Sequence, residues 1–375
     1  MEFDELLNLP PYSLDREEKG QLLGERLEEL TELHRENCRE YGRVLDLLQD
    51  GFFQRSDGGS APEGSRNGTW PAKHPWDCPF LPVRMFKDME LKSVPDEEVF
   101  KTMTSSGTTG QQVSKIYLDR ETSSRQQKTL VKIVKDFTGS ARMPMLVIDS
   151  PSVIKDRRMF SARGAGILGF SIFASDRKYA LHEDMSLDLE GILAFLEKHR
   201  GERILLFGFT FMIWQHFYLE LAKHPGKVDL SQGILIHGGG WKKLQKEKVA
   251  PETFRKELEK VCGISRIHDY YGMVEQTGCI YMECEEGHLH ASIFSDVIAR
   301  KKEDFSICPF GEEGIIQVVS AIPESYPGHS ILTEDMGIIL GEDDCPCGRL
   351  GKYFQITGRI KHAEVRGCSD TYEQK

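Results

Sequence analysis

The chain has little that suits nucleic acid or a membrane. It carries 48 Lys and Arg against 59 Asp and Glu, a formal net charge of −11, so electrostatics disfavour a general nucleic-acid-binding role. Its longest apolar stretch, from Ile204 to Trp214, is too short to span a bilayer, so no membrane insertion is expected. The opening residues, Met1 to Glu5, lack the positive start of a signal peptide, so we expect a cytoplasmic protein.

Hydrophobic patterning predicts an α/β fold. A helix is expected over residues 16–48, where apolar positions recur three and four apart, and a Gly/Ser/Pro-rich surface loop over 51–76. Buried strands are expected at 143–148, 203–207 and 233–237, with helices at 120–137, 210–224 and 246–262. This alternation is typical of mixed sheets covered by helices.

From residue 280 onward the sequence pattern is that of short strands and turns, which predicts a smaller β-rich lobe. Strands are expected at 280–283, 314–320, 331–333 and 338–340. The predicted domains are an N-terminal helical segment with its loop (1–80), an α/β core (81–279) and the β-rich lobe with a C-terminal tail (280–375).

The most informative feature is a run of small, mostly hydroxyl-bearing residues with a lysine downstream. The run comprises Thr104, Ser105, Ser106, Gly107, Thr108, Thr109 and Gly110, and Lys115 follows it. Converging N–H and O–H dipoles plus a lysine suit the oxygens of a polyphosphate, although the spacing is not that of a Walker A loop. A flexible linker is the alternative. A strand predicted at 115–119 disfavours it, because the loop then lies between ordered elements.

Glycines and aromatic residues follow two further predicted strands. Gly238, Gly239 and Gly240 come directly after the strand at 233–237, where ligands of open α/β sheets bind, although a tight turn would also use them. The later segment DYYGMVEQT has aromatic, Gly and Met residues that suit a flat base. Its Glu275 suits a Mg²⁺ ion bridging phosphates.

Two weaker signals lie nearer the C-terminus. A turn expected at Thr333-Glu334-Asp335 offers a carboxylate for ribose hydroxyls, and Arg359 follows Gly358; each also fits an ordinary turn. In this order, the loop with its lysine, the Gly-rich strand end, YYGMVE, the acidic turn and the GR pair resemble the adenylate-forming superfamily of acyl-CoA synthetases and luciferase-like ligases.

The resemblance runs from about Thr104 to Cys368 and implies a site for ATP and Mg²⁺. The phosphate loop and Lys115 would embrace the phosphates, and Glu275 would bind Mg²⁺. The implied contacts to adenine, the carboxylate substrate and ribose are Tyr271, Gly272, Met273, Asp335 and Arg359. The superfamily usually has Thr-Gly-Asp where this chain has Thr-Glu-Asp.

Only sixteen residues follow Arg359, so the mobile domain that superfamily members usually carry is expected to be absent. The segments SSGTTGQ, SKIYLD, GRIK and EVRGCSD are similar to one branch, the acyl-protein synthetases of bacterial bioluminescence, which work with a fatty-acid reductase. In that family a cysteine near the C-terminus accepts the acyl group, and Cys368 matches its position. The resemblance therefore implies a fatty-acid substrate and an acyl reductase partner.

The residues around Cys368 support this role only in part. Arg366 favours the thiolate and Asp370 opposes it, and a thiolate is a natural nucleophile toward an acyl adenylate. An incidental exposed cysteine is the alternative.

Two rival functions also stay open: a carboxylate–CoA ligase of the phenylacetate type, and a zinc-stabilised nucleotide-binding scaffold without turnover.

The other cysteines suggest a structural zinc site in the β-rich lobe. The proposed ligands are Cys284, His290, Cys345 and Cys347, with His288 as a substitute for His290. Related phenylacetate-CoA-ligase-like enzymes carry a similar arrangement. The residues Cys38, Cys78, Cys262, Cys279 and Cys308 are expected in the core or as incidental thiols. The apolar run 207–214 is expected to pack in the core, with the wall of an acyl pocket as the alternative.

Overall fold

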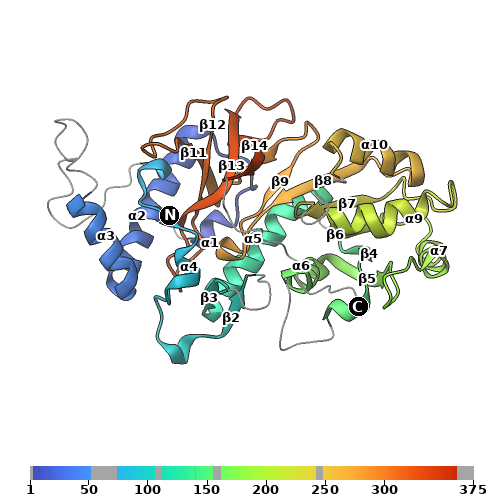
Figure 1. Cartoon of the computed structure of the whole chain (residues 1–375), viewed down its shortest axis with the longest axis horizontal. Coiled ribbons are helices and arrows are strands. Elements are labelled where there is room, and N and C mark those ends of the chain that lie inside the picture. Colours follow the sequence, from blue (N-terminus) through green and yellow to red (C-terminus); the bar gives the residue numbers. More distant parts are fainter. Residues whose placement is uncertain are drawn as a thin grey trace. The chain divides into compact units, whose positions relative to one another are not determined.

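The computed structural model describes residues 3–51, 74–105, 112–139, 141–154, 162–241 and 248–360. These residues form two compact units (Figure 1). The first unit contains the described residues up to Ser105, then residues 112–136 and 272–360; the second contains residues 137–271 as far as they are described. Within the described residues, no helix combines the length and apolar character needed to cross a bilayer.

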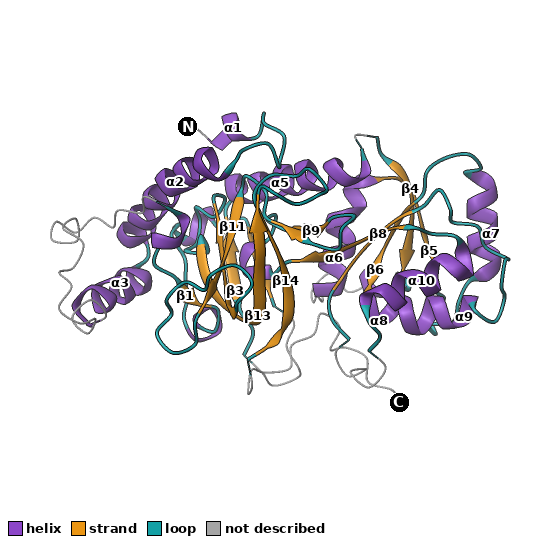
Figure 2. Cartoon of the chain, turned by 90° about the horizontal axis from the view of Figure 1, so that it is seen from above, coloured by secondary structure: helices purple, strands orange, loops and turns teal. Residues whose placement is uncertain are grey.

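The second unit is a parallel sheet with helices around it (Figure 2). Its strands are β4 (Met143–Ile148), β5 (Ala174–Tyr179), β6 (Leu205–Phe209), β7 (Ile234–Gly238) and β8 (Arg266–Tyr271), in the order β8-β7-β6-β4-β5. Its helices include α6 (Ala162–Phe170), α7 (Leu189–Lys198), α8 (Thr210–Met212), α9 (Leu219–Leu221) and α10 (Pro251–Cys262). Every residue of β4, β6 and β7 is buried, as expected for parallel strands covered on both faces. The predicted α/β class is therefore confirmed.

The predicted strands of this unit are confirmed to within two residues at each end. The helix predicted at 210–224 is less regular, because a π-helical turn, Ile213–Tyr218, separates α8 from α9. In this turn the rings of Trp214 and Tyr218 stack with centroids 4.3 Å apart. Trp214 also lies against Phe254 of α10, with centroids 6.0 Å apart. The apolar run at 207–214 is largely core, as expected.

The first unit joins both ends of the described chain. Besides a two-stranded hairpin described below, its strands are β1 (Leu81–Pro82), β9 (Tyr281–Glu283), β10 (Leu289–His290), β11 (Ser295–Arg300), β12 (Glu313–Ser320), β13 (Ser330–Glu342) and β14 (Lys352–Arg359). Strands β11 to β14 are antiparallel neighbours, β10 pairs with β14 and β9, and β1 lies parallel to β13. The helices are α1 (Phe3–Leu6), α2 (Arg16–Asn37), α3 (Arg39–Gly51), α4 (Met85–Asp88) and α5 (Arg120–Thr138). N-terminal helices and C-terminal strands share this unit. The three-part domain division stays a prediction.

Two details differ from the sequence-based expectation. The strands predicted at 331–333 and 338–340 are one strand, β13, which stays continuous through register shifts against β12 and β14. The helix predicted over 16–48 is two helices that meet at Cys38, whose backbone is extended (φ −123, ψ 101). Asp15 begins α2 with a capping box, in which its side chain accepts from the Glu18 N–H at 3.0 Å.

A buried carboxylate links the two ends of the first unit. Asp296 on β11 lies 2.6 Å from the Lys352 ammonium on β14 and 3.5 Å from the Lys19 ammonium on α2. All three side chains are almost fully buried. Burial alone raises the pKa of Asp296, but the two lysines outweigh it and hold that pKa below its usual value. The charged carboxylate therefore requires both partners.

Two neutral histidines fasten α2 to the rest of the unit. The ring of His34 stacks on that of His329 with centroids 4.9 Å apart. The Nδ1 and Nε2 atoms of His34 lie 2.8 Å from Ser93 Oγ and 3.1 Å from the Pro323 carbonyl. Burial lowers the pKa of His34 to about 3, and it lowers the pKa of His329 as well. Folding therefore favours the uncharged rings.

We expect this pair to make stability fall in mild acid. The folded pKa of His34 lies below the unfolded value of about 6.5, so its contribution is complete above pH 6.5 and is lost as the pH falls toward 3. The free energy of unfolding should fall by about 1.4 kcal/mol per pH unit in this window from His34 alone. Urea denaturation between pH 7 and pH 4 measures the slope. His34→Gln should flatten it, whereas the exposed His224→Gln should not; equal slopes in both variants would contradict the assignment.

Candidate functional site

The predicted phosphate loop connects two strands of a hairpin in the first unit. Strands β2 (Lys101–Thr104) and β3 (Lys115–Leu118) are antiparallel, and Thr104 lies directly opposite Lys115. Next to this pair, the Ser105 N–H donates to the Ser114 carbonyl at 3.1 Å and the Ser114 N–H donates to Ser105 Oγ at 2.9 Å. The neck of the hairpin is therefore closed by two residue pairs in succession, Thr104–Lys115 and Ser105–Ser114. Ser106, Gly107, Thr108, Thr109 and Gly110 lie outside the described residues.

Strand alternation fixes where the lysine side chain lies. Ile116 is fully buried, so its neighbour Lys115 belongs to the other face of the ribbon, where it is exposed. Thr104, its cross-strand partner, shares that face and is exposed as well. An ammonium and a hydroxyl thus stand side by side where the loop begins. That arrangement suits an anionic ligand at the loop.

The Gly-rich strand end belongs to the second unit, at the carboxyl end of β7. A Cβ atom on Gly238 would lie 2.5 Å from the Tyr270 ring, and Gly239 has a φ of 76°. Glycine is therefore required at both positions by this unit's own packing. At Gly240 a Cβ would meet nothing within 4 Å.

His237 precedes these glycines and is buried. Its Nδ1 atom lies 3.0 Å from Thr210 Oγ1, which also donates to the Gly238 carbonyl at 3.3 Å. Burial, together with the charges of Arg255 and His268, lowers the pKa of His237 to about 3. The neutral His237 ring therefore helps to hold the end of β7 in place through Thr210.

Sequence analysis missed a buried ion pair at the end of β4, another strand of the same sheet. Asp149 directly follows β4, and its carboxylate lies 3.0 Å from Arg163 Nε of α6. Burial raises the pKa of Asp149 to about 6 in spite of this partner. Its position just beyond a wholly apolar strand was the available signal, since strand carboxyl ends carry ligand sites in such sheets. Arg163 had no such signal.

Glu275 lies on a tightly held turn of the first unit. The turn is a 3₁₀ helix, Val274–Gln276, in which Glu275 is 2% exposed. The Tyr326 hydroxyl donates to the Glu275 carbonyl at 2.9 Å, and Gln276 Nε2 donates to the Gly328 carbonyl at 2.8 Å. The residues around the turn thus fix its backbone, so the carboxylate is presented from a rigid support. A carboxylate on such a turn fits a Mg²⁺ ligand.

The expected Thr-Glu-Asp turn is wrong, because these residues lie inside β13. Asp335 pairs in register with Arg359 of β14, and Arg359 Nε donates to Asp335 Oδ1 at 3.1 Å. Arg359 Nη2 also donates to Glu334 Oε2 at 3.2 Å. In this strand the backbone N–H and C=O groups pair with the neighbouring strand, so the acidic side chains are not needed to stabilise a turn. The two residues implied for ribose are therefore side by side.

The predicted nucleotide residues divide between the two units. Those of the first unit are Thr104, Ser105, Lys115, Gly272, Met273, Glu275, Asp335 and Arg359, and those of the second are Gly238, Gly239, Gly240 and Tyr271. Their assembly into one site stays a prediction. Cys368 lies outside the described residues.

The four residues predicted to bind zinc lie together in the first unit. The ligand atoms of Cys284, His290, Cys345 and Cys347 all lie within 4.8 Å of one another. The Cys284 and Cys345 sulfurs are 3.9 Å apart, close to the roughly 3.8 Å that tetrahedral Zn–S bonds of about 2.3 Å impose.

The nitrogen side of this cluster distinguishes the two candidate histidines. Cys347 Sγ lies 3.4 Å from His290 Nε2, whereas the His288 ring lies beside Cys345, with its Nδ1 3.4 Å from that sulfur. Burial raises the pKa of Cys345, so a cation is what makes its thiolate favourable. The donor set fits Zn²⁺ in a closed, structural site, and zinc binding stays a prediction.

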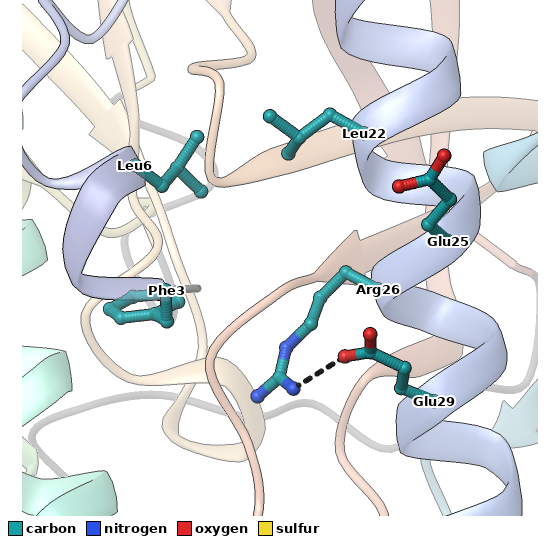
Figure 3. Close-up of a pocket in the computed structure, with 6 residues that line it drawn as sticks. All are labelled: Phe3, Leu6, Leu22, Glu25, Arg26 and Glu29. Carbon is teal, nitrogen blue, oxygen red and sulfur yellow. Dashed lines mark hydrogen bonds and ion pairs between the residues drawn. The ribbon is translucent and has the colours of Figure 1, made fainter. Parts of the chain in front are cut away.

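A small cavity between α1 and α2 does not suit the proposed chemistry. Its volume is about 10 Å³, and Phe3, Leu6 and Leu22 line it (Figure 3). Arg26 reaches toward it and donates to Glu29 at 3.0 Å. Such a space is far smaller than a nucleotide or acyl site, for which several hundred Å³ are usual.

Comparison with known proteins identifies the family. The sequence model of the family described as acyl-protein synthetase, LuxE, matches residues 74–375. The chain belongs to this acyl-protein synthetase family. It is therefore a ligase, as the sequence motifs predicted, and membership supports ATP-dependent activation of an acyl group.

Similar proteins include the long-chain-fatty-acid–luciferin-component ligase of Vibrio harveyi, which is 24% identical over 311 residues, spanning 80% of this chain and 78% of its own. Its counterpart in Aliivibrio fischeri is also 24% identical, over 307 residues, with 78% and 77% of the two chains covered.

Solved structures support the fold. A 2-hydroxyisobutyryl-CoA ligase in an open conformation superimposes with a TM-score of 0.68 at 14% identity, over 94% of this chain and 77% of that one. The same ligase in its postadenylation state gives a TM-score of 0.66, with 94% and 72% covered. At this identity the likeness establishes the acyl-protein synthetase chain as a member of the same fold, and no more.

We expect purified protein to contain one zinc ion per chain. Cys345→Ser should lose the metal and lower Tm by on the order of 10 °C, because a closed metal site contributes directly to folding. Inductively coupled plasma mass spectrometry and thermal unfolding measure both effects. Cys308→Ser is the matched control, since Cys308 is buried in the same unit outside the cluster. Metal-free wild type with an unchanged Tm after chelation would contradict the zinc assignment.

Proposed function

We propose that this protein activates a long-chain fatty acid with ATP and then carries it as a thioester on Cys368 for a partner acyl reductase. The observation that carries the proposal is the hairpin that sets Lys115 against Thr104 at the mouth of the hydroxyl-rich loop, in a chain of the acyl-protein synthetase family. The curated relatives named as long-chain-fatty-acid–luciferin-component ligases support the choice of acid.

In the first half-reaction a carboxylate oxygen of the acid attacks the α-phosphorus of ATP, and the bond from that phosphorus to the bridging oxygen of pyrophosphate breaks. The products are acyl-AMP and pyrophosphate. Lys115 and the loop donors would stabilise the negative charge on the phosphoryl oxygens in the transition state. Glu275 would hold Mg²⁺, which neutralises phosphate charge when bound. Asp335 and Arg359 would position the ribose.

In the second half-reaction the Cys368 sulfur attacks the acyl carbonyl carbon. A C–S bond forms, the C–O bond to AMP breaks, and the thiol proton passes to solvent. The thioester retains enough reactivity for transfer to a partner. An acyl reductase is the partner that the family's association with luciferin-component ligases favours.

A carboxylate–CoA ligase of the phenylacetate type is the competing function, because it would share every residue of the first half-reaction. The choice depends on the acceptor thiol. Membership of a ligase family disfavours the scaffold alternative, since a scaffold has no need for the loop, Lys115 and Glu275 together.

We expect a fatty-acyl adduct on wild-type protein that Cys368→Ser cannot form. Intact-protein mass spectrometry after incubation with ATP, Mg²⁺ and a panel of fatty and aryl acids measures it. The adduct should require ATP and be removed by hydroxylamine, as a thioester is. The Cys368→Ser variant should still release pyrophosphate, because adenylation precedes transfer. Pyrophosphate release without an adduct would instead indicate CoA or another thiol as the acceptor.

We also expect Lys115→Ala to slow acid-dependent pyrophosphate release about 10²–10³-fold, the usual effect of removing one preorganised transition-state donor. The matched control is Lys101→Ala, an exposed lysine of the same hairpin that pairs with Leu118 at its far end. This control should retain activity within about twofold of the wild type. Equal losses in both variants would indicate damage to the hairpin and count against a specific role for Lys115.

A further inference from the structure

The connection between β12 and β13, residues 321–329, is buried although it forms neither helix nor strand. All of its residues except Glu324 lie in the interior of the first unit. Connections usually run over the surface, because water then satisfies their backbone N–H and C=O groups. Here protein groups take the place of water; the Ser325 carbonyl, for example, accepts from the Ser93 N–H at 2.8 Å. The partners of this connection therefore indicate which parts of the unit it holds together.

Tyr326 of this connection holds the turn that presents Glu275. Its hydroxyl donates to the Glu275 carbonyl at 2.9 Å, and two residues further on the Gly328 carbonyl accepts from Gln276 Nε2 at 2.8 Å. A Cβ on Gly328 would overlap the Tyr326 ring, so glycine is required there for the ring to take this position. The turn is thus bonded at two successive residues by one buried connection.

The preceding residue, Ser325, is bonded to the strand that carries Lys115. Ser325 Oγ donates to the carbonyl of Tyr117 at 2.8 Å, and Tyr117 lies two residues beyond Lys115 on β3. The Ser325 N–H donates to Oγ1 of Thr122, in the first turn of α5, at 3.2 Å. Ser325 therefore fixes the junction between β3 and α5.

Helix α5 adds a second contact between the same two regions. Gln126 Nε2 of α5 donates to the Tyr326 hydroxyl at 3.5 Å. Gly278, two residues after the turn, has a φ of 95°, and a Cβ on it would lie 2.6 Å from Gln126 Cα. The backbone after the turn therefore packs directly on the helix. Since α5 begins directly after β3, the strand of Lys115 and the turn of Glu275 belong to one continuous network of contacts.

We propose that Ser325 and Tyr326 are positioning residues for adenylation, whose two hydroxyls set the separation between Lys115 and Glu275. This inference rests on the proposed function. There Lys115 and the Mg²⁺ held by Glu275 act on the same polyphosphate, so the spacing between them matters as much as the position of either. A misplacement of about 1 Å in such a site can cost about 100-fold in rate.

The test removes single hydroxyls. Tyr326→Phe and Ser325→Ala each delete one donor of the network. Tyr281→Phe is the matched control, because Tyr281 is also fully buried in the first unit and its hydroxyl donates to the Asp296 carbonyl at 3.1 Å. Acid-dependent pyrophosphate release gives kcat, the KM for ATP and the Mg²⁺ concentration at half-maximal rate. Urea denaturation gives the stability of each variant.

Tyr326→Phe and Ser325→Ala should each lower kcat about tenfold, as the loss of a partner that orients a metal ligand commonly does. Tyr326→Phe should also raise the Mg²⁺ concentration at half-maximal rate about tenfold, because it loosens the turn of Glu275. The double variant should be little slower than either single variant, since both hydroxyls maintain one spacing. Tyr281→Phe should lose similar stability yet keep kcat and the Mg²⁺ requirement within about twofold of wild type.

Wild-type kcat and Mg²⁺ requirement in both Tyr326→Phe and Ser325→Ala would overturn the inference and leave the proposed function intact. Losses that multiply in the double variant would overturn the shared spacing. An equal loss of kcat in Tyr281→Phe would mean that rate follows stability, which would overturn the inference as well. Absence of pyrophosphate release by the wild type with every acid would overturn the proposed function, and this inference with it.

Discussion

The first unit depends on the pairing of one buried carboxylate with two ammonium groups from opposite ends of the chain. Asp296 is inaccessible to water, so removal of either Lys19 or Lys352 would leave a charge that the interior solvates poorly. Because Lys19 lies in α2 and Lys352 in β14, the pairing forms only when these two regions, far apart in the sequence, have come together. Contacts of such long sequence separation make folding slower than local pairing does. The loop-bearing hairpin belongs to the same unit.

Much of the fold is readable from local sequence because the pattern and the structure have the same cause. The strand at 143–148 is apolar at nearly every position, and it is buried on both faces. The prediction was less successful where tertiary contacts determine the local backbone conformation. The chain leaves helical geometry at Cys38, although the flanking sequence continues a helical pattern. The Thr333–Asp335 segment has the composition of a turn, yet cross-strand pairing with β14 keeps it extended.

The candidate site shows the same division. Lys115 follows the loop closely, so a hairpin brings it back to the loop almost automatically. The Cys/His cluster was predictable because its residue types have few other uses in combination, and the structure adds which histidine faces the fourth position. The Asp149–Arg163 pair could not be foreseen in full. Arg163 has no distinguishing neighbours, and its role depends on where α6 packs.

The π-helical turn Ile213–Tyr218 has a consequence for how this segment tolerates change in length. A π turn holds one residue more than an α turn, so it is in effect an insertion that a helix has absorbed. Deletion of one residue there would restore a regular helix, but it would rotate everything on one side by about 100° relative to the other. Trp214 could then no longer face Tyr218 and Phe254 at once. The contacts of Trp214 with Tyr218 and Phe254 therefore depend on the length of this turn. A chain one residue shorter would have to pack its aromatic side chains differently.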